Sequence, residues 1–395
     1  MASYWANIKI DRPLLMIVIF LGLFSFAPVY SASIGLAFQY ASFDTFTSLF
    51  KHAVLVGLGF VILWGAQSLP FRYYGPLSKV LLPLSILLLM ITLGRGTTIG
   101  DANASRWITI PGIGVSFQPS AFAAVALMIY LARYLFKSEG NYGNFKSTLF
   151  KGILPIVLVC GLVLPANFST AALIFLSSMT LLFIGGYPIR YLLNILGLGV
   201  AGLSIFILTV LAFPNISNRV DTWKSRIENF STGDPESNYQ VERAKMAIAE
   251  GGLIGRGPGK STQKHFLPQS TSDFIYAVIV EEYGLIGGMM ILLAYVWMLF
   301  RIIKIARKAP NHFGRLLAIG LGSVIIFQAF VNLSVAVNLI PVTGQPLPLV
   351  SAGGSSTWMV CLALGVILSV SRDEMTESPE QEENTEAPTE DSAYA

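Results

Sequence analysis

The sequence predicts an all-α polytopic membrane protein with about ten transmembrane helices and one long extracytoplasmic loop. Hydrophobic residues make up 54% of the 395 positions and charged residues only 12%, about half the charged share of a typical soluble domain. The mean hydropathy is +0.64. The apolar residues also gather in runs that are long enough to cross a bilayer.

Ten apolar runs account for the predicted helices. The first has no clear small-residue cleavage site after it, so we expect a retained signal anchor. Several runs contain proline, and neighbouring helices can satisfy the backbone groups that proline frees. The runs lie near residues 13–34, 48–69, 76–94, 114–136, 149–165, 168–187, 190–213, 285–303, 314–341 and 349–371.

The distribution of lysine and arginine predicts the orientation. With ten spans, the basic residues of the N-terminal arm, of the even-numbered connections and of the C-terminal end all fall on one side. The short connections on the opposite side, 165–169 and 341–351, contain neither lysine nor arginine. Because basic residues accumulate in cytoplasmic loops, we expect both termini in the cytoplasm of a bacterial cell and a multi-pass domain over residues 1–371.

The C-terminal segment 372–395 has a different composition. After Arg372 it contains nine acidic residues and no basic ones, with almost no apolar side chains. Such a segment cannot bury enough surface to offset the loss of chain entropy. We therefore expect a disordered cytoplasmic tail, which acts as a solvated tether and not as a specific docking site.

The connection 214–272 is much longer than the others and is predicted to lie outside the cell. Its own basic residues do not oppose this placement, since long loops are translocated largely regardless of charge. Long, partly structured loops in compact proteins are usually functional. Residues 238–252 within it have the pattern of a short amphipathic helix that ends at glycines.

The stretch Gly255–Ser261 looks like a nucleotide-binding loop but does not qualify as one. Ile254 stands where the leading glycine belongs, the glycine spacing is one residue too short, and no strand precedes it. An external loop also faces away from cytoplasmic ATP, so we expect no nucleotide. Its basic residues, which include Lys264, fit a phosphate or pyrophosphate contact. A plainly solvated basic loop is equally compatible with them.

Asp273 stands at the boundary between this loop and an apolar run. It has two interpretations: an N-cap of the following helix, or a general base whose pKa the wet–dry boundary raises. Glu281 and Glu282 follow about 12–14 Å further along a helix. They are buried acids if the segment enters the membrane. Alternatively, the segment is an outer amphipathic helix and the span begins near Leu285.

Two further outward connections contain polar clusters. Arg106 beside Trp107 fits either an interfacial anchor or a cation of a shared external cavity. Residues 341–356 are rich in Pro, Gly and Ser, which suits tight helix packing or anion binding by exposed amides. Cys160 and Cys361 lie in apolar runs and are expected to be packing residues. The three histidines have no metal-ligand spacing.

These motifs occur together in an order that resembles the SEDS family (shape, elongation, division and sporulation), and most of all its cell-division members. The resemblance covers about residues 70–371. The matching motifs are N-x-x-R-W at Asn103–Trp107, FQPS at Phe117–Ser120, YQ at Tyr239–Gln240, G-x-G-x-S-x-Q-K-x-x-L-P at 257–268 with flanking residues, D-F-I-x-A-x-x-x-E-E-x-G at Asp273–Gly284, and a long motif at Asn332–Ser356 that ends in GGSS.

The resemblance implies a peptidoglycan glycosyltransferase that polymerises lipid II outside the bacterial inner membrane. It implies Asp273 as the essential acid. As contacts to lipid II or its pyrophosphate, we expect Lys264, Gln263, Ser261, Arg226, Arg243, Arg106, Ser355 and Ser356. A divalent cation, Mg or Mn, is a candidate cofactor. The implied partners are undecaprenyl-linked glycan, a class B penicillin-binding protein and other division proteins, with no nucleic acid.

Two departures from the family pattern affect this expectation. Ala121 and Ala124 replace a Glu and a Lys that many relatives carry, and Gln269 replaces a Glu. No role can be transferred to these positions. Two other classes remain open: a lipid II flippase and a non-catalytic division scaffold. The crowding of polar features on the outer face favours the enzyme over the transporter.

Overall fold

The fold is an assembly of helices, and the computed structural model describes residues 10–39, 44–95, 107–109, 116–138, 149–212, 226, 230, 239–267 and 270–385. The helices are α2 (Arg12–Phe24), α3 (Phe26–Gln39), α4 (Thr45–Ser68), α5 (Tyr74–Arg95), α6 (Pro119–Ser138), α8 (Leu154–Val163), α9 (Phe168–Ile184), α10 (Ile189–Ala212), α12 (Tyr239–Gly251), α13 (Ile275–Lys308), α14 (His312–Ala336) and α15 (Ser355–Thr385). Shorter elements are η1 (Phe71–Tyr73), η2 (Leu149–Ile153), η4 (Gln263–His265) and the antiparallel pair β1 (Ile108–Thr109) and β2 (Ser116–Phe117).

The described residues contain eight helical segments that are long and apolar enough to cross a membrane. Two shorter apolar helices, Phe150–Val163 and Phe168–Ile184, accompany them. Each of these segments coincides with one of the ten predicted runs, which identifies a multi-pass membrane protein. The exact count of ten remains a prediction, because the two short helices fall below the roughly 20 residues that a crossing requires.

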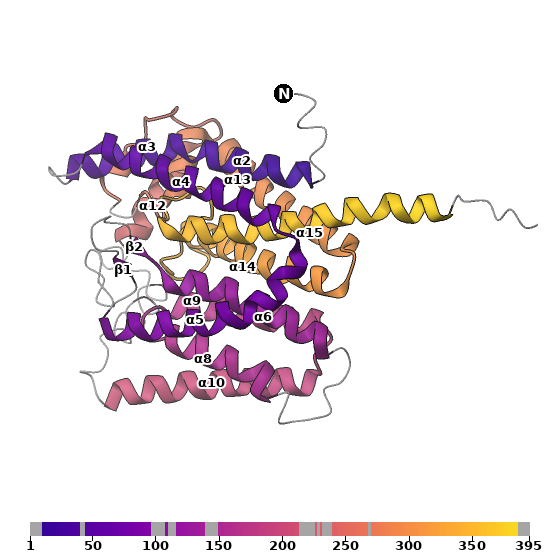
Figure 1. Ribbon diagram of the computed structural model, residues 1–395. Coiled ribbons are helices and arrows are strands. Elements are labelled where there is room, and N and C mark those ends of the chain that lie inside the picture. Colours follow the sequence, from indigo (N-terminus) through magenta and orange to yellow (C-terminus); the bar gives the residue numbers. More distant parts are fainter. Residues whose placement is uncertain are drawn as a thin grey trace, which may run out of the picture.

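The helices form layers around α14 (Figure 1). Helices α2, α3 and α4 lie on one side, α13 and α15 lie in the middle, and α8 and α10 lie on the far side. Helix α14 packs against α6, α9, α13 and α15. Its Leu316, Leu317 and Leu321 are fully buried, so the centre of the bundle is an apolar core.

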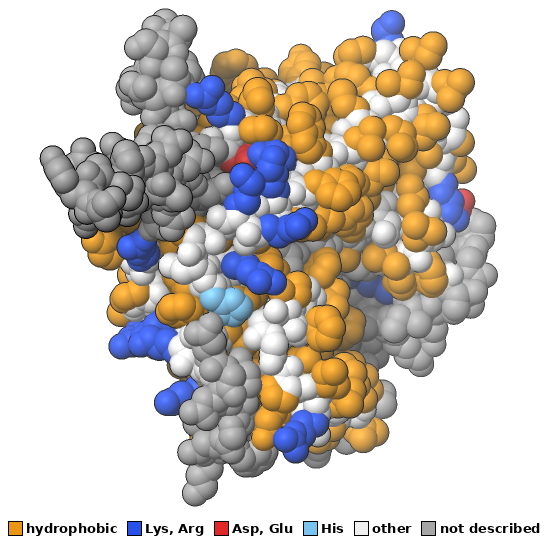
Figure 2. All heavy atoms as spheres, turned by 90° about the vertical axis from the view of Figure 1, so that its right-hand side faces the viewer, with side chains coloured by type: hydrophobic (Ala, Val, Ile, Leu, Met, Phe, Trp, Pro, Cys, Tyr) orange, Lys and Arg blue, Asp and Glu red, His pale blue; other side chains and the backbone are white. Residues whose placement is uncertain are grey.

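The start of α2 and the last buried turn of α15 lie at the same end of the bundle. The backbone N–H of Asp11 donates to Ser371 Oγ at 3.0 Å, and the Asp11 carboxylate pairs with Arg301 of α13. Helix α12 and the strands lie at the opposite end (Figure 1). Lys and Arg side chains gather over the end where α2 begins and α15 leaves the bundle (Figure 2). This grouping agrees with the predicted charge sidedness, while the assignment of this end to the cytoplasm remains a prediction.

Three predicted helix boundaries are wrong by several residues. Helix α6 begins at Pro119 and not at 114, because residues 116–117 pair with 108–109. Helix α14 ends at Ala336 and not at 341, because Asn338 takes a left-handed conformation (φ 57°). Helix α15 begins at Ser355, after a loop in which Leu349 has φ 66°. Positive φ is rare outside glycine, and hydropathy does not report it. The apolar runs alone therefore could not predict where α14 ends or where α15 begins.

Helix α13 is interrupted at Gly284, where φ is 71° and ψ is −173°. The break separates a front segment, residues 275–283, from the apolar helix that follows. The candidate membrane-crossing segment extends over Ile275–Lys308, so the start of the span near Leu285 remains a prediction. The front segment is not an exposed amphipathic helix, however, because Glu281 and Glu282 are 0% and 1% exposed. They are buried inside the protein instead.

The predicted amphipathic helix at 238–252 is confirmed as α12, Tyr239–Gly251. The C-terminal segment differs in part from the expectation of a disordered tail, since α15 continues to Thr385. Glutamate favours helix formation, which lets the helix continue past the body. Residues 386–395 lie outside the described residues.

Candidate functional site

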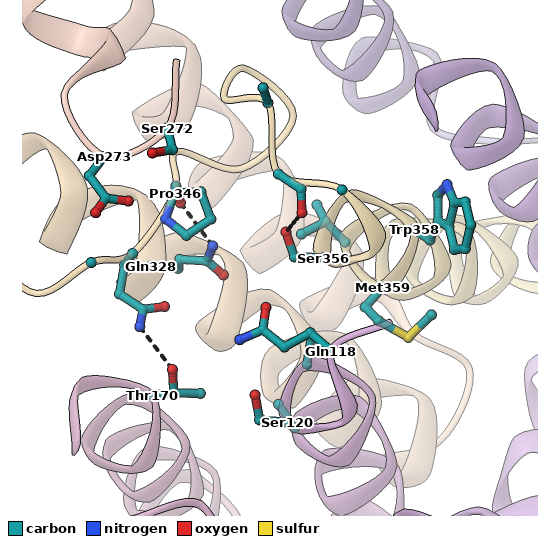
Figure 3. Close-up of a pocket in the computed structure, with 18 of the residues that line it drawn as sticks. Gln118, Ser120, Thr170, Ser272, Asp273, Gln328, Pro346, Ser356, Trp358 and Met359 are labelled. Carbon is teal, nitrogen blue, oxygen red and sulfur yellow. Dashed lines mark hydrogen bonds between the residues drawn. The ribbon is translucent and has the colours of Figure 1, made fainter. Parts of the chain in front are cut away.

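A cavity of about 1110 Å³ opens where α4, α6, α9, α14 and α15 meet the loop that precedes α15. Five polar lining side chains, which we call the polar ring, come from the part of the cavity toward β1 and β2. The polar ring consists of Ser120, Thr170, Asp273, Gln328 and Ser356. Figure 3 shows Asp273, Ser272 and Gln328 on one side of the cavity, with Trp358 and Met359 on the other. The site is therefore assembled from segments that are far apart in the sequence.

Asp273 lines this cavity and is held by its backbone. Asn332 Nδ2 of α14 donates to the carbonyl of Asp273 at 2.9 Å and to the carbonyl of Gln345 at 2.7 Å. Asp273 does not act as the N-cap of α13; Phe274 occupies that position and makes no side-chain capping bond. A Cβ built on Gly344 would lie 3.6 Å from Asp273 Oδ2, so the carboxylate borders the Pro/Gly-rich loop.

Arg226 supplies a cation beside this carboxylate. It lines the cavity, and its Nη1 donates to the carbonyl of Val342 at 3.1 Å. Burial lowers the pKa of the guanidinium, and the negative charge of Asp273 opposes that shift. An arginine remains charged under such shifts. Among the predicted cations that lie within the described residues, Arg226 is thus the one that the structure brings to Asp273.

Hydrogen bonds among neutral side chains and backbone carbonyls hold the rest of the polar ring. Gln345 Nε2 donates to Thr170 Oγ1 at 2.9 Å, and Gln328 Nε2 donates to the Pro346 carbonyl at 2.8 Å (Figure 3). Sequence reasoning did not single out Gln328. Its signal was available, because a lone amide inside an apolar run of a membrane protein usually faces the interior of the bundle.

The two predicted serines of the GGSS motif have different positions. Ser356 lines the cavity, and its hydroxyl donates to the Gly353 carbonyl at 2.6 Å. Ser355 is fully buried and accepts a bond of 2.9 Å from the backbone N–H of Gln118. Ser355 therefore ties the start of α15 to the FQPS segment, and Ser356 alone of the pair faces the cavity.

The predicted contacts Ser261, Gln263 and Lys264 do not line the cavity. They surround the two buried acids of the front segment instead. Ser261 Oγ donates to Glu281, and the backbone N–H of Gln263 donates to Glu281 Oε1 at 3.3 Å. Gln263 Nε2 donates to Glu250 of α12 at 3.1 Å. Their assignment as substrate contacts remains a prediction that this placement does not favour.

Lys264 is 3% exposed. Its Nζ donates to Ser31 Oγ of α3 at 2.9 Å and to the Gly259 carbonyl at 2.6 Å. Burial lowers the pKa of its ammonium, while the charges of Glu282 and Glu281 act in the opposite direction. The sequence did not predict these contacts of Lys264. They depend on the break at Gly284, which lets the loop pack against Glu281 and Glu282.

Arg243, another predicted cation, lies away from the cavity. The guanidinium of Arg243 stacks over the rings of Tyr239 and Phe266, with centroid distances of 5.0 and 4.7 Å. It does not appear among the residues that line the cavity. Arg106 and Gln269 fall outside the described residues. Trp107, next to Arg106, does line the cavity.

The glycine stretch that resembles a nucleotide loop packs against the backbone of α13. The N–H groups of Arg256 and Gly257 donate to the carbonyls of Glu281 and Glu282 at 3.0 and 2.9 Å. A Cβ on Gly255 would lie 2.3 Å from the Glu282 carbonyl oxygen. These amides bond to the backbone of α13, so they are not directed at an anion.

The described residues contain no group of three His, Cys, Asp or Glu side chains arranged for a metal ion. Asp273 is the one carboxylate among the described residues that line the cavity. Magnesium is commonly held by one or two carboxylates together with substrate phosphates and water. The donor set therefore suits a divalent cation only when a substrate supplies phosphate oxygens. Cys160 and Cys361 are free thiols.

These features define a multi-pass membrane protein with a polar, acid-containing cavity. Residues 12–376 match the family described as cell cycle protein, which comprises FtsW, RodA and SpoVE, and the chain belongs to this family. It is 33% identical over 371 residues to stage V sporulation protein E of Bacillus subtilis, with 92% of this chain and 98% of that protein covered.

Another relative is the probable peptidoglycan glycosyltransferase FtsW of Escherichia coli O157:H7, which is 32% identical over 370 residues, or 92% of this chain and 86% of that protein. The chain also resembles the crystal structure of the rod shape determining protein RodA of Thermus thermophilus (TM-score 0.65, 26% identity, 92% of this chain and 97% of that one). A further similar structure comes from work described as structural coordination of polymerization and crosslinking by a peptidoglycan synthase complex (TM-score 0.70, 26% identity, 92% of this chain and 98% of that one).

Proposed function

We propose that the chain is a peptidoglycan glycosyltransferase that polymerises lipid II at the outer face of the inner membrane during cell division. The observation that carries this proposal is the position of Asp273, whose carboxylate borders a large cavity next to the cation of Arg226. Membership of the family and the names of the relatives support the reaction class.

In the proposed reaction, Asp273 acts as a general base. It takes the proton from the sugar 4-hydroxyl of an acceptor lipid II. The freed oxygen forms a bond to the anomeric carbon of the growing strand, and the bond from that carbon to the pyrophosphate oxygen breaks. Undecaprenyl pyrophosphate leaves with the electron pair, and the proton stays on Asp273 until solvent removes it.

The leaving pyrophosphate gains negative charge, which a preorganised cation stabilises. The bond of Arg226 to the Val342 carbonyl and its electrostatic interaction with Asp273 support this role. Asp273 is the carboxylate that would hold a divalent cation, which would supply Lewis-acid stabilisation of the leaving group. The polar ring offers neutral donors and acceptors for the sugar hydroxyls.

We also propose a class B penicillin-binding protein as partner, together with undecaprenyl-linked glycan as donor. The similar structure from a peptidoglycan synthase complex that coordinates polymerization with crosslinking supports a crosslinking partner. Polymer made outside the membrane would pass directly to such a transpeptidase. The active site and α12 would then face the extracytoplasmic side, with both termini in the cytoplasm.

The test is polymerisation of lipid II by purified protein, with and without the co-expressed penicillin-binding protein. Asp273→Asn should abolish polymer while the protein still inserts and folds. Asp44→Asn is the matched control, because Asp44 caps α4 from an exposed position and Asn caps equally well. Full polymer output from Asp273→Asn would refute the assignment of the base. Lipid II movement across proteoliposomes without polymer would favour a flippase, and normal division in cells carrying Asp273→Asn would favour a scaffold.

A further inference from the structure

Helix α3 is joined to the front segment of α13 by a buried cluster of three side chains. Ser31 of α3, Lys264 of the long loop and Glu282 of the front segment are 1%, 3% and 1% exposed. Lys264 Nζ donates to Ser31 Oγ at 2.9 Å, and Ser31 Oγ in turn donates to Glu282 Oε1. We call these three residues the Ser31 cluster. One hydroxyl thus connects a buried ammonium with a buried carboxylate.

The two buried charges depend on that hydroxyl, because a serine oxygen can accept and donate a hydrogen bond at the same time. Glu282 Oε1 also accepts from the backbone N–H of Ser261, at 3.3 Å. Glu282 Oε2 has no hydrogen-bond partner among the described residues. A buried charge that loses a partner is costly. The favoured arrangement is therefore the one that keeps Ser31 between Lys264 and Glu282.

Glu281, the neighbour of Glu282, does not make this connection. Its carboxylate accepts hydrogen bonds from three residues of the loop, Ser261, Thr262 and Gln263. Glu281 therefore joins the loop to the front segment, whereas Glu282 extends the contact to α3.

Helix α3 contacts different neighbours on its two faces. Ser31 and Gly35, one turn apart, face the loop, and a Cβ on Gly35 would lie 2.4 Å from the Lys264 carbonyl oxygen. Ser33 is rotated by about 200° from Ser31 around the helix axis. Its Oγ lies 3.3 Å from Ser48 Oγ of α4. Helix α3 thus lies between the loop and α4.

Helix α4 belongs to the cavity wall that lies opposite Asp273. Ser25, directly before α3, contacts His52 of α4, with 2.8 Å between Oγ and Nε2. Lys51, next to His52, lines the cavity. Trp358 Nε1 donates to a backbone carbonyl of α4 at 3.0 Å, and Figure 3 shows Trp358 across the cavity from Asp273. Helix α3 therefore connects the α4 wall with the segment that follows Asp273.

We propose that Ser31 is a positioning residue: it couples α3 to the front segment and so holds Asp273 at a fixed distance from the α4 wall. This inference rests on the proposed function and deepens it. Ser31 is not among the described residues that line the cavity, so it acts through Glu282 and not on the substrate. A misplacement of about 1 Å at a reacting group can cost up to about 100-fold in rate, so the effect falls on kcat.

Ser31→Ala tests the coupling with a small change, since it removes one hydroxyl and no apolar volume. Ser85→Ala is the matched control. Ser85 is also fully buried in a membrane-crossing helix, but its hydroxyl donates to the Leu82 carbonyl of the same helix at 2.7 Å. Both variants lose a buried serine hydroxyl, and only Ser31→Ala loses a contact between distant segments.

The first measurement is hydrogen–deuterium exchange of the full chain in nanodiscs, read by mass spectrometry. In Ser31→Ala, we expect amide exchange to rise at least ~5-fold in two segments, residues 26–39 and 270–283, because local opening becomes easier when the contact between them is lost. Ser85→Ala should match the parent in both segments. A rise confined to residues 26–39, or no rise, would overturn the coupling.

The second measurement is lipid II polymerisation at varied substrate concentration. Ser31→Ala should lower kcat about 10-fold with KM within about twofold of the parent, while Ser85→Ala keeps both. The double variant Ser31→Ala/Lys264→Met should lose no more kcat than Lys264→Met alone, since residues that act as one unit are not additive. A rise in KM without a loss of kcat, or additive losses, would overturn the positioning role.

The two measurements separate this inference from the proposed function. If the parent makes no polymer, the proposed reaction fails, and exchange in residues 270–283 alone decides whether Ser31 couples α3 to the front segment. If the parent makes polymer and Ser31→Ala retains the parental kcat, the positioning role fails and the reaction stands.

Discussion

The backbone N–H of Thr262 donates a hydrogen bond of 2.7 Å to Oε1 of Glu281, nineteen residues further along the chain. The Thr262 hydroxyl donates to the same oxygen at 3.0 Å. The Glu281 carboxylate therefore holds the loop segment around Thr262 against the front segment of α13. This front segment begins two residues after Asp273. The loop and the front segment behave as one packed unit.

Replacing Glu281 by Ala should lower the free energy of unfolding by about 3 kcal/mol, because several buried donors lose a charged acceptor. The measurement is thermal or denaturant unfolding of the purified protein in detergent. Glu242→Ala is the control, since its pair with Lys245 lies on the surface of α12. It should cost less than about 1 kcal/mol. Equal losses in both variants would contradict the fastening role of Glu281.

Lys264 should give stability a pH dependence in the alkaline range. Burial lowers its pKa below 10.5 in the folded state, so the unfolded chain binds more protons between the folded pKa and 10.5. The free energy of unfolding therefore rises with pH in that window and is flat for this group below it. Lys264→Met should remove the rise, whereas Lys260→Met, at an exposed position, should retain it. Unfolding curves from pH 8 to 10.5 test this, and an identical slope in Lys264→Met would contradict it.

Arg226→Met should reduce lipid II polymerisation by about 100-fold in kcat, since one preorganised contact to developing charge is lost. Arg226→Lys should recover part of the rate, because it keeps the charge without the planar guanidinium. Arg243→Met removes a cation that stacks on Tyr239 and Phe266 away from the cavity. It should leave kcat within about twofold of the parent. A similar loss in both Met variants would point to a general effect on the loop.

Gly284→Ala should destabilise the protein by more than about 2 kcal/mol. Its φ of 71° disfavours any Cβ, and that atom would lie 2.3 Å from the Leu253 carbonyl oxygen. Gly161→Ala is the control in an ordinary stretch of α8, where a Cβ would meet nothing within 4 Å. It should be neutral or stabilising by up to about 1 kcal/mol. Comparable melting temperatures for the two variants would refute the packing argument.

The fold was predictable from the sequence where hydrophobicity decides the structure. Each apolar run became a helix, because a membrane-spanning backbone must satisfy its own hydrogen bonds. The errors occur where backbone conformation decides instead, as at Asn338, Leu349 and Gly284. Single residues at positive φ end or break a helix without any change in hydropathy.

The site was predictable in part. Asp273 stood out because an acid at the edge of an apolar run is unusual, and the structure places it in the cavity. Lys264 stood out for its charge, yet its surroundings depend on acids that come seventeen and eighteen residues later and on the turn at Gly284. Gln328 carried a sequence signal as a lone amide in an apolar run, but only the packing of α14 shows which cavity it lines.

The contact between the glycine stretch and the break in α13 also has a genetic consequence. Cβ atoms on Gly251, Gly255 and Gly284 would all fall within 2.4 Å of backbone atoms on the opposing segment. These neighbours are backbone atoms, which a substitution elsewhere cannot remove or shorten as it can a side chain. We therefore expect no second substitution to relieve the clash at any of the three glycines. A saturation library of this region, selected for growth, should therefore return glycine at these codons while the neighbouring Leu253 and Ile254, which are 69% and 80% exposed, vary freely.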